Sequence, residues 1–402
     1  MKLKIKIELP IIWTDMGLGK TFVGSEKMKE LGEDLNIIVC QKSKIDDWYE
    51  HIKTYYPNYN VIKYDKPQEI KPNTVIIINY DKLWRREELA RLTNFTLVLD
   101  ESSYIKNESS KRTKFILKMK AKNVILLSGT PTGGKYEELY SQCKLLGWKV
   151  NKKTFWDTYI NYFELKLNGF RIKKITGYKN VDRLKRKLRE YGAVFMKTEE
   201  VFDLPDQLHY TINVEKTKWY DMFKKDNLFI HEDEDIEFIG DTSLARLLYM
   251  RKLCGVHNYN KLEKLKEMLE STEDRLIIFY NFKDECKAIE TMCKQLQKPV
   301  SIVNGSIKDL KNYDEHSNSV TLVQYQAGAM GLNLQKANKI IYFGLTLSSE
   351  LFEQSKKRVH RIGQDKSCIY YYLITKGTIE EDIFETLKER RDYTDQLFKE
   401  NN

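Results

Sequence analysis

The sequence predicts an α/β protein with two parallel-sheet lobes and a helical insertion or linker between them. Two series of short β-branched runs alternate with helical patterns, and a stretch with few strand-like runs separates the two series. Short buried strands separated by helices are typical of a parallel sheet with helices on both faces. We therefore expect a first lobe at residues 1–148, a helical and basic insertion and linker at residues 149–255, and a second lobe at residues 256–402.

Each lobe follows from its own series of elements. In the first lobe the β-branched runs predict strands at Asn36–Cys40, Val75–Tyr80, Leu97–Asp100 and Val124–Gly129, with helices at Gly19–Leu31 and Lys44–Tyr56. In the second lobe the same pattern predicts strands at Leu276–Tyr280, Val300–Val303, Val320–Tyr325, Lys339–Phe343 and Ile369–Ile374, with helices at Lys283–Gln297 and Ser349–Val359. No sequence repeat accompanies this repeated architecture.

Length and composition are those of a globular protein. The chain has 402 residues, of which 41% are hydrophobic and 31% charged, and this suits two or three domains without long disordered tails. No apolar run approaches the roughly 20 residues that span a bilayer. The first residues alternate Lys with apolar side chains, which is unlike a signal peptide. We expect a monomer with no membrane contact in the cytoplasm of a bacterium or of a viral host, or in the nucleus if the source is eukaryotic.

Positive charge is concentrated in two stretches. The net charge is +10, and residues 166–197 carry eleven Lys or Arg against Asp182 and Glu190. A second basic stretch runs from Lys106 to Lys122. Such stretches are often solvated surfaces, but a polyanion such as nucleic acid is the partner that they would attract. Both interpretations stay open on charge alone.

A phosphate-binding loop is predicted near the start of the chain. The apolar strand Ile11–Trp13 leads into a glycine-containing loop that ends in Gly-Lys-Thr and opens a helix, which is the context that such a loop requires. Backbone N–H groups and the helix N-terminus would bind phosphate oxygens. Lys20 would bridge the terminal phosphates, and the Thr21 hydroxyl would reach Mg²⁺. The nucleotide-binding residues are therefore predicted to be Asp15, Met16, Gly17, Leu18, Gly19, Lys20 and Thr21. A chance match remains an alternative, because Thr14 replaces the first glycine of the strict pattern.

Two carboxylates follow an apolar strand in a Walker B pattern. The strand Thr96–Leu99 ends in Asp100 and Glu101. Asp100 would hold Mg²⁺, and Glu101 would orient and deprotonate the attacking water. Carboxylates that cap the next helix are the alternative, but capping explains only one of the two. The loop Ser128–Pro131, after another predicted strand, could sense the terminal phosphate.

The motifs resemble those of a known family. DMGLGKT, LVLDESSYIKN, LLSGTPTGGKYEELY, QAGAMGLNL and EQSKKRVHRIGQ occur in the order found in the Swi/Snf-type ATPases of helicase superfamily two. The resemblance covers the chain from Trp13 to about Leu387 and implies two RecA-like lobes that bind ATP and Mg²⁺. It also implies that Arg358 and Arg361 act as arginine fingers, with Gln354 and Gln364 in support, and that Gly331 and Gln364 contact the nucleotide. Gln354, Arg358 and Arg361 are spaced as on one face of a helix, although a cationic face could equally be a surface feature.

The resemblance also implies nucleic-acid contacts at the ends of strands in both lobes. They are Lys42, Ser43, Tyr80, Lys106, Asn107, Gly305, Ser306 and Gln326, in loops that suit phosphate contacts without sequence preference. The chain departs from the family pattern at three points. Only thirteen residues precede Thr14, so the glutamine segment that recognises adenine is expected to be missing or replaced. Ser103 stands where histidine is usual, and residues 307–319 are shorter than usual.

These observations predict a DNA-stimulated ATPase that moves along double-stranded DNA, with accessory proteins left open as partners. A strand-separating DNA or RNA helicase is the main alternative, but it would need a wedge, and no obvious hairpin insertion provides one. A non-hydrolysing scaffold would lack Lys20, Glu101 or Arg361, and all three are present. A phosphate-loop enzyme for small molecules would not need the second lobe.

Overall fold

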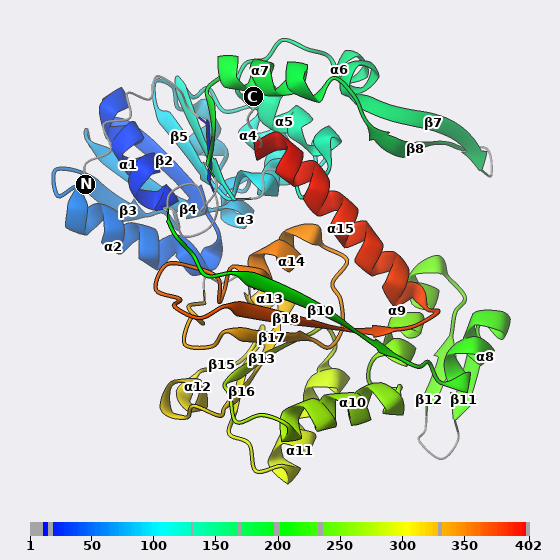
Figure 1. The fold of residues 1–402 in the computed structure, drawn as a ribbon. Helices are drawn as coiled ribbons and strands as arrows, with labels where there is room; N and C mark the ends of the chain where they lie inside the picture. Colours follow the sequence, from blue (N-terminus) through cyan, green and yellow to red (C-terminus); the bar gives the residue numbers. More distant parts are fainter. Residues whose placement is uncertain are drawn as a thin grey trace. The chain divides into compact units, whose positions relative to one another are not determined.

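The computed structural model describes residues 11–14, 19–129, 132–167, 170–196, 202–231, 236–328 and 332–398. The chain divides into two compact units (Figure 1). Unit 1 comprises Met1–Val201 together with Arg390–Asn402, and unit 2 comprises Phe202–Glu389. Each unit is built on a largely parallel sheet, so the predicted α/β class with two sheet-containing lobes is confirmed.

The sheet of unit 1 has the strand order β3–β4–β2–β5–β6–β1–β9. Its strands are β1 (Ile11–Thr14), β2 (Leu35–Cys40), β3 (Asn60–Lys63), β4 (Thr74–Asn79), β5 (Thr96–Asp100), β6 (Asn123–Ser128) and β9 (Ala193–Met196). All of these pairs are parallel. Trp13 pairs with Ser128 and Asp100 with Leu127, so β1, β5 and β6 end together at one edge of the sheet.

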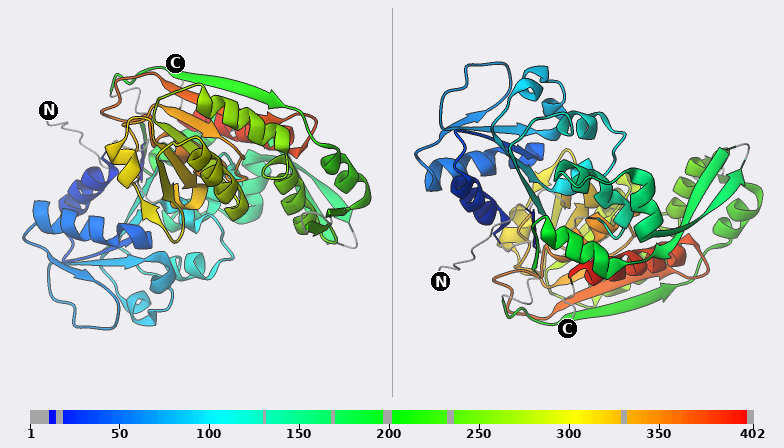
Figure 2. Two further views of the ribbon diagram at one scale, coloured as in Figure 1. Left: turned by 90° about the horizontal axis from the view of Figure 1, so that it is seen from below. Right: turned by 90° about the horizontal axis from the view of Figure 1, so that it is seen from above.

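Helices cover both faces of this sheet. On one face lie α1 (Lys20–Leu31) and α2 (Ile45–Tyr55), whose Met28, Trp48 and Ile52 pack against the strands (Figure 2). The other face packs against α4 (Lys111–Ile116), α5 (Tyr140–Leu145), α6 (Lys152–Tyr159) and α7 (Val181–Glu190). Short turns connect these elements, namely α3 (Tyr80–Leu83), η1 (Lys42–Lys44), η2 (Glu87–Arg91), η3 (Ser102–Ile105) and η4 (Tyr136–Leu139).

An antiparallel hairpin lies between α6 and α7. It is formed by β7 (Ile160–Leu167) and β8 (Phe170–Tyr178). The expectation of a helical insertion is wrong for this segment, and so is the expectation that no hairpin insertion is present. Cations separate the apolar residues along both strands, which hid the strand character behind a basic composition.

The sheet of unit 2 has the strand order β10–β18–β17–β13–β16–β14–β15. Its strands are β10 (Gln207–Val214), β13 (Leu276–Tyr280), β14 (Val300–Val303), β15 (Lys308–Asp309), β16 (Val320–Gln324), β17 (Lys339–Tyr342) and β18 (Cys368–Thr375). Only the β14–β15 pair at one edge is antiparallel among the described strands of this sheet. β10 pairs along its whole length with β18, and so joins residues 207–214 to unit 2.

The helices of unit 2 are α10 (Tyr259–Glu270), α11 (Lys283–Gln295), α12 (Lys311–Glu315), α13 (Tyr325–Gly328) and α14 (Ser349–Lys356). A small subdomain combines α8 (Lys218–Asp226) and α9 (Ser243–Cys254) with the hairpin of β11 (Leu228–His231) and β12 (Ile236–Ile239). The section before α10 is therefore mixed α/β, which also corrects the helical expectation.

The helix α15 (Ile379–Phe398) starts in unit 2 and ends in unit 1. Its start is fixed by a buried ion pair in which the Lys261 Nζ lies 2.7 Å from both carboxylate oxygens of Glu380. Near its end it approaches Gly134, where any Cβ atom would lie 2.3 Å from the backbone oxygen of Arg390. Within the described ranges, no helix has the length and apolar character to cross a membrane.

Candidate nucleotide-binding site

The three described residues of the predicted phosphate loop, Gly19, Lys20 and Thr21, lie at the start of α1. Gly19 precedes the helix in a left-handed conformation, with φ 70° and ψ 33°, which glycine adopts without strain. Lys20 and Thr21 form the first helical turn, where unpaired backbone N–H groups and the helix dipole favour an anion. Asp15, Met16, Gly17 and Leu18 lie outside the described residues, so their predicted role stays a prediction.

A close approach between α1 and the sheet fixes the position of this helix. A Cβ atom at Gly24 would lie 2.8 Å from the Leu127 Cδ1, well inside van der Waals contact. Glycine therefore lets α1 rest directly on β6. The strand β6 is hydrogen-bonded to β5 on one side and β1 on the other, so α1 has a defined position relative to the ends of both strands.

A residue of α2 donates a hydrogen bond to the Asp100 carboxylate at the end of β5. The indole N–H of Trp48 donates to Asp100 Oδ2 over 2.9 Å. Desolvation by the surrounding protein raises the pKa of Asp100, while the bond from Trp48 and the positive charge of Lys20 act to lower it. Lys20 and Asp100 are therefore close enough to interact, as the prediction of a shared phosphate and metal site requires.

Glu101 adopts an uncommon backbone conformation. Its φ is 55° and its ψ 63°, in the left-handed region, which costs about 1–2 kcal/mol for a residue with a Cβ atom. Such strain is concentrated at functional sites, where it directs a side chain. The Tyr80 hydroxyl donates to the carbonyl oxygen of Asp100 over 2.8 Å and thereby holds this turn. The end of β5 and the turn at Glu101 are thus held by hydrogen bonds from Trp48 and Tyr80.

Tyr80 lies behind the carboxylates. Its side chain is buried in the core of unit 1, and its ring stacks on that of Tyr104 with 5.0 Å between centroids. This burial favours a positioning role, and the nucleic-acid contact of Tyr80 stays a prediction. Trp48 was not predicted as a site residue, because an apolar position in an amphipathic helix gives no sign of a polar contact.

The residues at this edge fit a divalent cation. Mg²⁺ prefers oxygen ligands such as carboxylates and hydroxyls. Asp100 offers a carboxylate at the end of β5, and burial raises its pKa. Thr21 lies next to Lys20 in the first turn of α1. Ser102 and Ser103, which follow the acidic pair, are buried, and the Ser102 hydroxyl donates to Gln142 Oε1 over 2.9 Å. Thr130 and Pro131 of the neighbouring loop lie outside the described residues.

Unit 2 presents the two predicted arginine fingers after a helix and not on it. α14 ends at Lys356, so the expectation that Gln354, Arg358 and Arg361 share one helical face is wrong. Arg358 is buried. The Arg361 side chain has no ion pair or hydrogen bond within the described part of the chain, and burial lowers the pKa of its guanidinium. A partly desolvated cation of this kind suits an anionic ligand.

Gln364 stabilises the segment after α14 through hydrogen bonds within unit 2. Its Nε2 donates to the carbonyl oxygens of Gln335 and Ala337, at 3.1 and 2.9 Å, and its Oε1 accepts from the backbone N–H of Lys366. Its amide is used in these bonds to the backbone, and the nucleotide contact of Gln364 stays a prediction. Gln354 is also buried. Gly331 lies outside the described residues, so its nucleotide contact stays a prediction.

The residues predicted to contact nucleic acid differ in exposure. Lys42, Ser43, Asn107, Ser306 and Gln326 are exposed. Gly305 follows Asn304, whose side-chain oxygen accepts from the backbone N–H groups of Ser306 and Ile307. These positions are compatible with backbone phosphate contacts, which remain a prediction for all of them.

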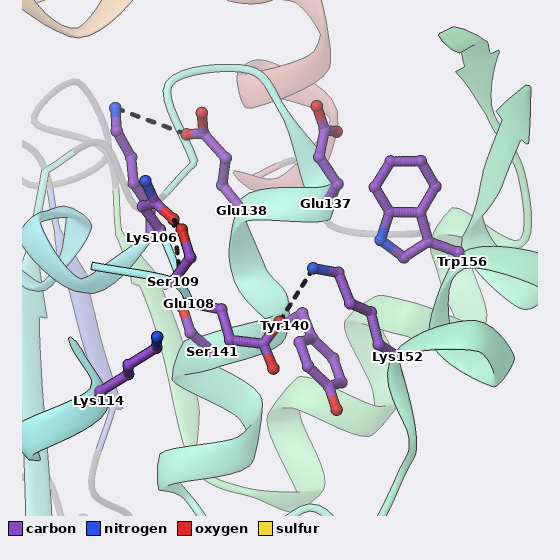
Figure 3. Close-up of a pocket in the computed structure, with 11 residues that line it drawn as sticks. Lys106, Glu108, Ser109, Lys114, Glu137, Glu138, Tyr140, Ser141, Lys152 and Trp156 are labelled. Atoms are coloured by element: carbon purple, nitrogen blue, oxygen red, sulfur yellow. Dashed lines mark hydrogen bonds and ion pairs between the residues drawn. The ribbon is translucent and has the colours of Figure 1, made fainter. Parts of the chain in front are cut away.

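Lys106 and Asn107 line a cavity of about 640 Å³ in unit 1 (Figure 3). Lys106 forms an ion pair with Glu138 at 3.7 Å, and Lys152 of the same cavity pairs with Glu108 at 3.0 Å. Cations and carboxylates are therefore matched in this cavity, which makes it a poor phosphate site without rearrangement.

The exposed side of α7 is more strongly basic. Arg183 and Arg186 line a second cavity of about 430 Å³ together with Trp148, and neither arginine has an ion pair within the described ranges. Arg189 is also exposed, whereas Lys185 is buried. The predicted basic insertion thus offers at least three solvated cations, and Lys185 is excluded from that set.

A helix that follows a glycine loop, beside a strand that ends in an acidic pair, is typical of the phosphate-loop class of nucleotide-binding proteins. A family model described as SNF2-related domain matches residues 7–259, and a model described as helicase conserved C-terminal domain matches residues 260–363. The first match alone covers more than half of the chain, so the protein belongs to the SNF2-related family.

Similar proteins are found in bacteria and in eukaryotes. The chain is 25% identical over 439 residues to YwqA of Bacillus subtilis, whose name gives it as a candidate ATP-dependent helicase/translocase; the match covers 96% of this chain and 46% of YwqA. It is 26% identical to an uncharacterised ATP-dependent helicase of Mycoplasma genitalium, covering 95% of this chain and 39% of that protein. The chain thus spans less than half the length of these relatives.

Among solved structures, the chain resembles the Sulfolobus solfataricus SWI2/SNF2 ATPase core in complex with dsDNA. The TM-score is 0.45 and the sequence identity 22%, over 96% of this chain and 88% of that one.

Proposed function

We propose that this chain is an ATP-driven motor that moves along double-stranded DNA. The observation that carries the proposal is that the positive charge of Lys20 acts on the Asp100 carboxylate, at the edge of the sheet where β1, β5 and β6 end. A cation for phosphate and a carboxylate for a metal ion are both needed to hold a nucleoside triphosphate, and they come from separate segments of the sequence. The relatives named as ATP-dependent enzymes support the choice of nucleotide.

The chemistry assigned to the first unit is binding and water activation. Lys20, Thr21 and the N–H groups at the start of α1 would hold the phosphates. Asp100 would hold Mg²⁺, which when bound neutralises charge on the phosphate oxygens. Glu101, directed by its left-handed backbone, would orient the attacking water and accept its proton.

The second unit would complete the reaction through Arg361. Its guanidinium is partly desolvated and has no anionic partner within the described residues. We infer that it binds the terminal phosphate when the two units close, and that DNA favours closure. Hydrolysis would then be coupled to movement, because the arginine contributes only in the closed state.

Duplex DNA is the proposed track, and the exposed arginines of α7 are part of the proposed contact surface. The rate of ATP hydrolysis should rise with duplex DNA more than with single-stranded DNA or RNA. Displacement of a triplex-forming oligonucleotide without release of a duplex strand would support translocation, whereas strand release would favour a helicase.

The α7 surface is tested by salt dependence. Replacing Arg183, Arg186 and Arg189 by Gln should weaken DNA binding and flatten the plot of log affinity against log salt by up to about 0.9 units for each lost phosphate contact. Lys264 and Lys266 on α10, both ion-paired with glutamates, provide the matched control. An unchanged slope in the α7 variant would show that this surface is only solvated.

A further inference from the structure

The β7–β8 hairpin has an apolar outer face. Phe163, Leu165 and Ile172 are 44%, 39% and 50% exposed. Phe163 and Leu165 are two residues apart on β7, and Leu165 lies directly opposite Ile172 on β8, so the three side chains point to the same side of the hairpin. Such grouped exposure is unusual for a solvated surface, where single apolar residues are the norm.

The opposite face anchors the hairpin to unit 1. Tyr162 and Ile175, which pair across the strands, pack against the main core of this unit. The Tyr162 hydroxyl donates to Asp157 Oδ1 over 2.8 Å. At the base, Tyr178 stacks on Tyr136 with 4.3 Å between ring centroids. The hairpin is therefore held by one face and one end, while Phe163, Leu165 and Ile172 on the outer face are exposed.

Exposed cations lie on both faces of the hairpin. Lys174, which pairs with Phe163, shares the outer face, whereas Lys166, Arg171 and Lys173 lie with Glu164 on the anchored face. Lys174 lies 5.8 Å from the Phe163 ring centre, and Lys173 lies 4.1 Å from that of Tyr162. A polyanion is the partner that this charge favours.

The combination of cations and apolar side chains narrows the choice of polyanion. Intact duplex DNA presents phosphates and groove edges, and its base faces are stacked inside the helix. Unpaired bases present flat apolar faces beside phosphates, and they stack on aromatic side chains or are wedged apart by Phe, Leu or Ile. A surface with both features therefore matches DNA that has unpaired bases next to a duplex.

We propose that the outer face of the β7–β8 hairpin binds the unpaired bases at a junction between duplex and single-stranded DNA. This inference rests on the proposed DNA motor and adds to it a preferred substrate, a forked or gapped duplex, together with the residues that recognise it. Phe163, Leu165 and Ile172 contact the base faces, and Lys174 contacts an adjoining phosphate.

The test compares a forked duplex with a blunt duplex of the same length, by fluorescence anisotropy without ATP. Wild type should bind the fork more tightly. A variant with Phe163, Leu165 and Ile172 replaced by Thr, which keeps the strand propensity, should bind the fork at least about tenfold more weakly. The same variant should keep wild-type ATPase stimulation by blunt duplex. A 2-aminopurine placed at the first unpaired position of the fork should change its fluorescence when wild type binds. This change should be lost with the triple variant.

The hairpin of unit 2 provides a matched control. Leu228, Ile230 and Ile239 on β11 and β12 are exposed to a similar degree, and their replacement by Thr should leave fork binding unchanged. The single variant Ile172→Thr, which retains a β-branched side chain, should show part of the loss even if the triple variant folds poorly.

Several outcomes would overturn the inference. Equal binding of fork and blunt duplex by wild type, or a retained fork preference in the triple variant, would do so. If the triple variant keeps the fork preference but loses self-association, this face binds a second copy of the chain. If it keeps the fork preference but loses binding to anionic vesicles, this face binds a membrane surface. If wild type hydrolyses no ATP in response to any DNA, the proposed motor fails; fork binding measured without ATP would still decide the role of the hairpin.

Discussion

Trp48→Phe tests how the Asp100 carboxylate, the proposed Mg²⁺ ligand, is held. The change removes the indole N–H that donates to Asp100 Oδ2 and keeps an aromatic ring in the buried position. A hydrogen bond to an ionised group contributes about 1.5–3 kcal/mol, against about 0.5–1.5 kcal/mol for a neutral pair. Loss of the donor should therefore raise the pKa of Asp100 further, in the direction that burial already moves it.

The sign of the pH dependence follows from that shift. A carboxyl group with a raised pKa is penalised when it ionises, so its contribution to stability is most favourable at low pH and is lost as the pH rises through the pKa of the folded state. The variant should lose little stability at pH 5 and more at pH 8. For a unit of this size, 1.5–3 kcal/mol corresponds to a fall in Tm of about 3–12 °C.

The assays are thermal unfolding without nucleotide at both pH values and the Mg²⁺ concentration that half-saturates ATP hydrolysis. That concentration should rise in the variant, and more at low pH than at high pH, because Mg²⁺ must compete with a proton at Asp100. Trp156→Phe is the control, since the indole nitrogen of Trp156 has no hydrogen-bond partner within the described residues. Wild-type Mg²⁺ dependence and the same Tm loss at both pH values in Trp48→Phe would refute this role for Trp48.

Three other changes probe the site. Glu101→Gln should leave Mg-ATP binding nearly intact and cut hydrolysis at least about a hundredfold in a steady-state assay; more than half of wild-type turnover would mean that another group activates the water. Gly24→Val should cost about 1–3 kcal/mol in denaturant unfolding and weaken nucleotide binding, because its side chain would displace Leu127; Leu127→Ala should restore part of the binding, and no such rescue would argue against the close contact. Arg361→Ala should abolish the DNA-stimulated part of hydrolysis, a loss of roughly a thousandfold for a full arginine finger. Normal stimulation in this variant would mean that Arg361 is a surface residue without a role in hydrolysis.

The inner strands of both sheets were predictable because they are nearly continuous β-branched runs, whereas the edge strands β3, β9, β10 and β15 were not predicted. β4, for example, is buried at every residue, and only a strand or a buried helix accommodates such a run. The β7–β8 hairpin was missed because its apolar residues alternate with Lys and Arg, so that the basic composition drew attention first. The Asn168-Gly169 dipeptide between the two runs is a strong sequence signal for a hairpin turn and could have revealed it.

Candidate site residues could be predicted where a motif states the chemistry, and not where one residue supports another. Lys20 and Asp100 were predicted from their motifs, and in the structure the charge of Lys20 acts on Asp100. Tyr80 and Gln364 were also found by position, but their polar groups bond to the backbone of their own unit. A motif shows that a residue is needed near the site, while only coordinates show whether it faces the ligand or the chain behind it.

The two units share a physical property that links their stability to their ligands. Unit 1 carries at Asp100 a negative charge that burial disfavours, and unit 2 carries at Arg361 a positive charge that burial disfavours. Burial of each charge costs its unit stability, which Trp48 and Lys20 partly offset at Asp100 and which a ligand of opposite charge would offset further. A cation would offset the first, and an anionic phosphate the second. A ligand that brings both, such as a metal-bound nucleoside triphosphate, should therefore stabilise both units more than either ion alone, and this difference is the free energy that can be used to drive a change between two states.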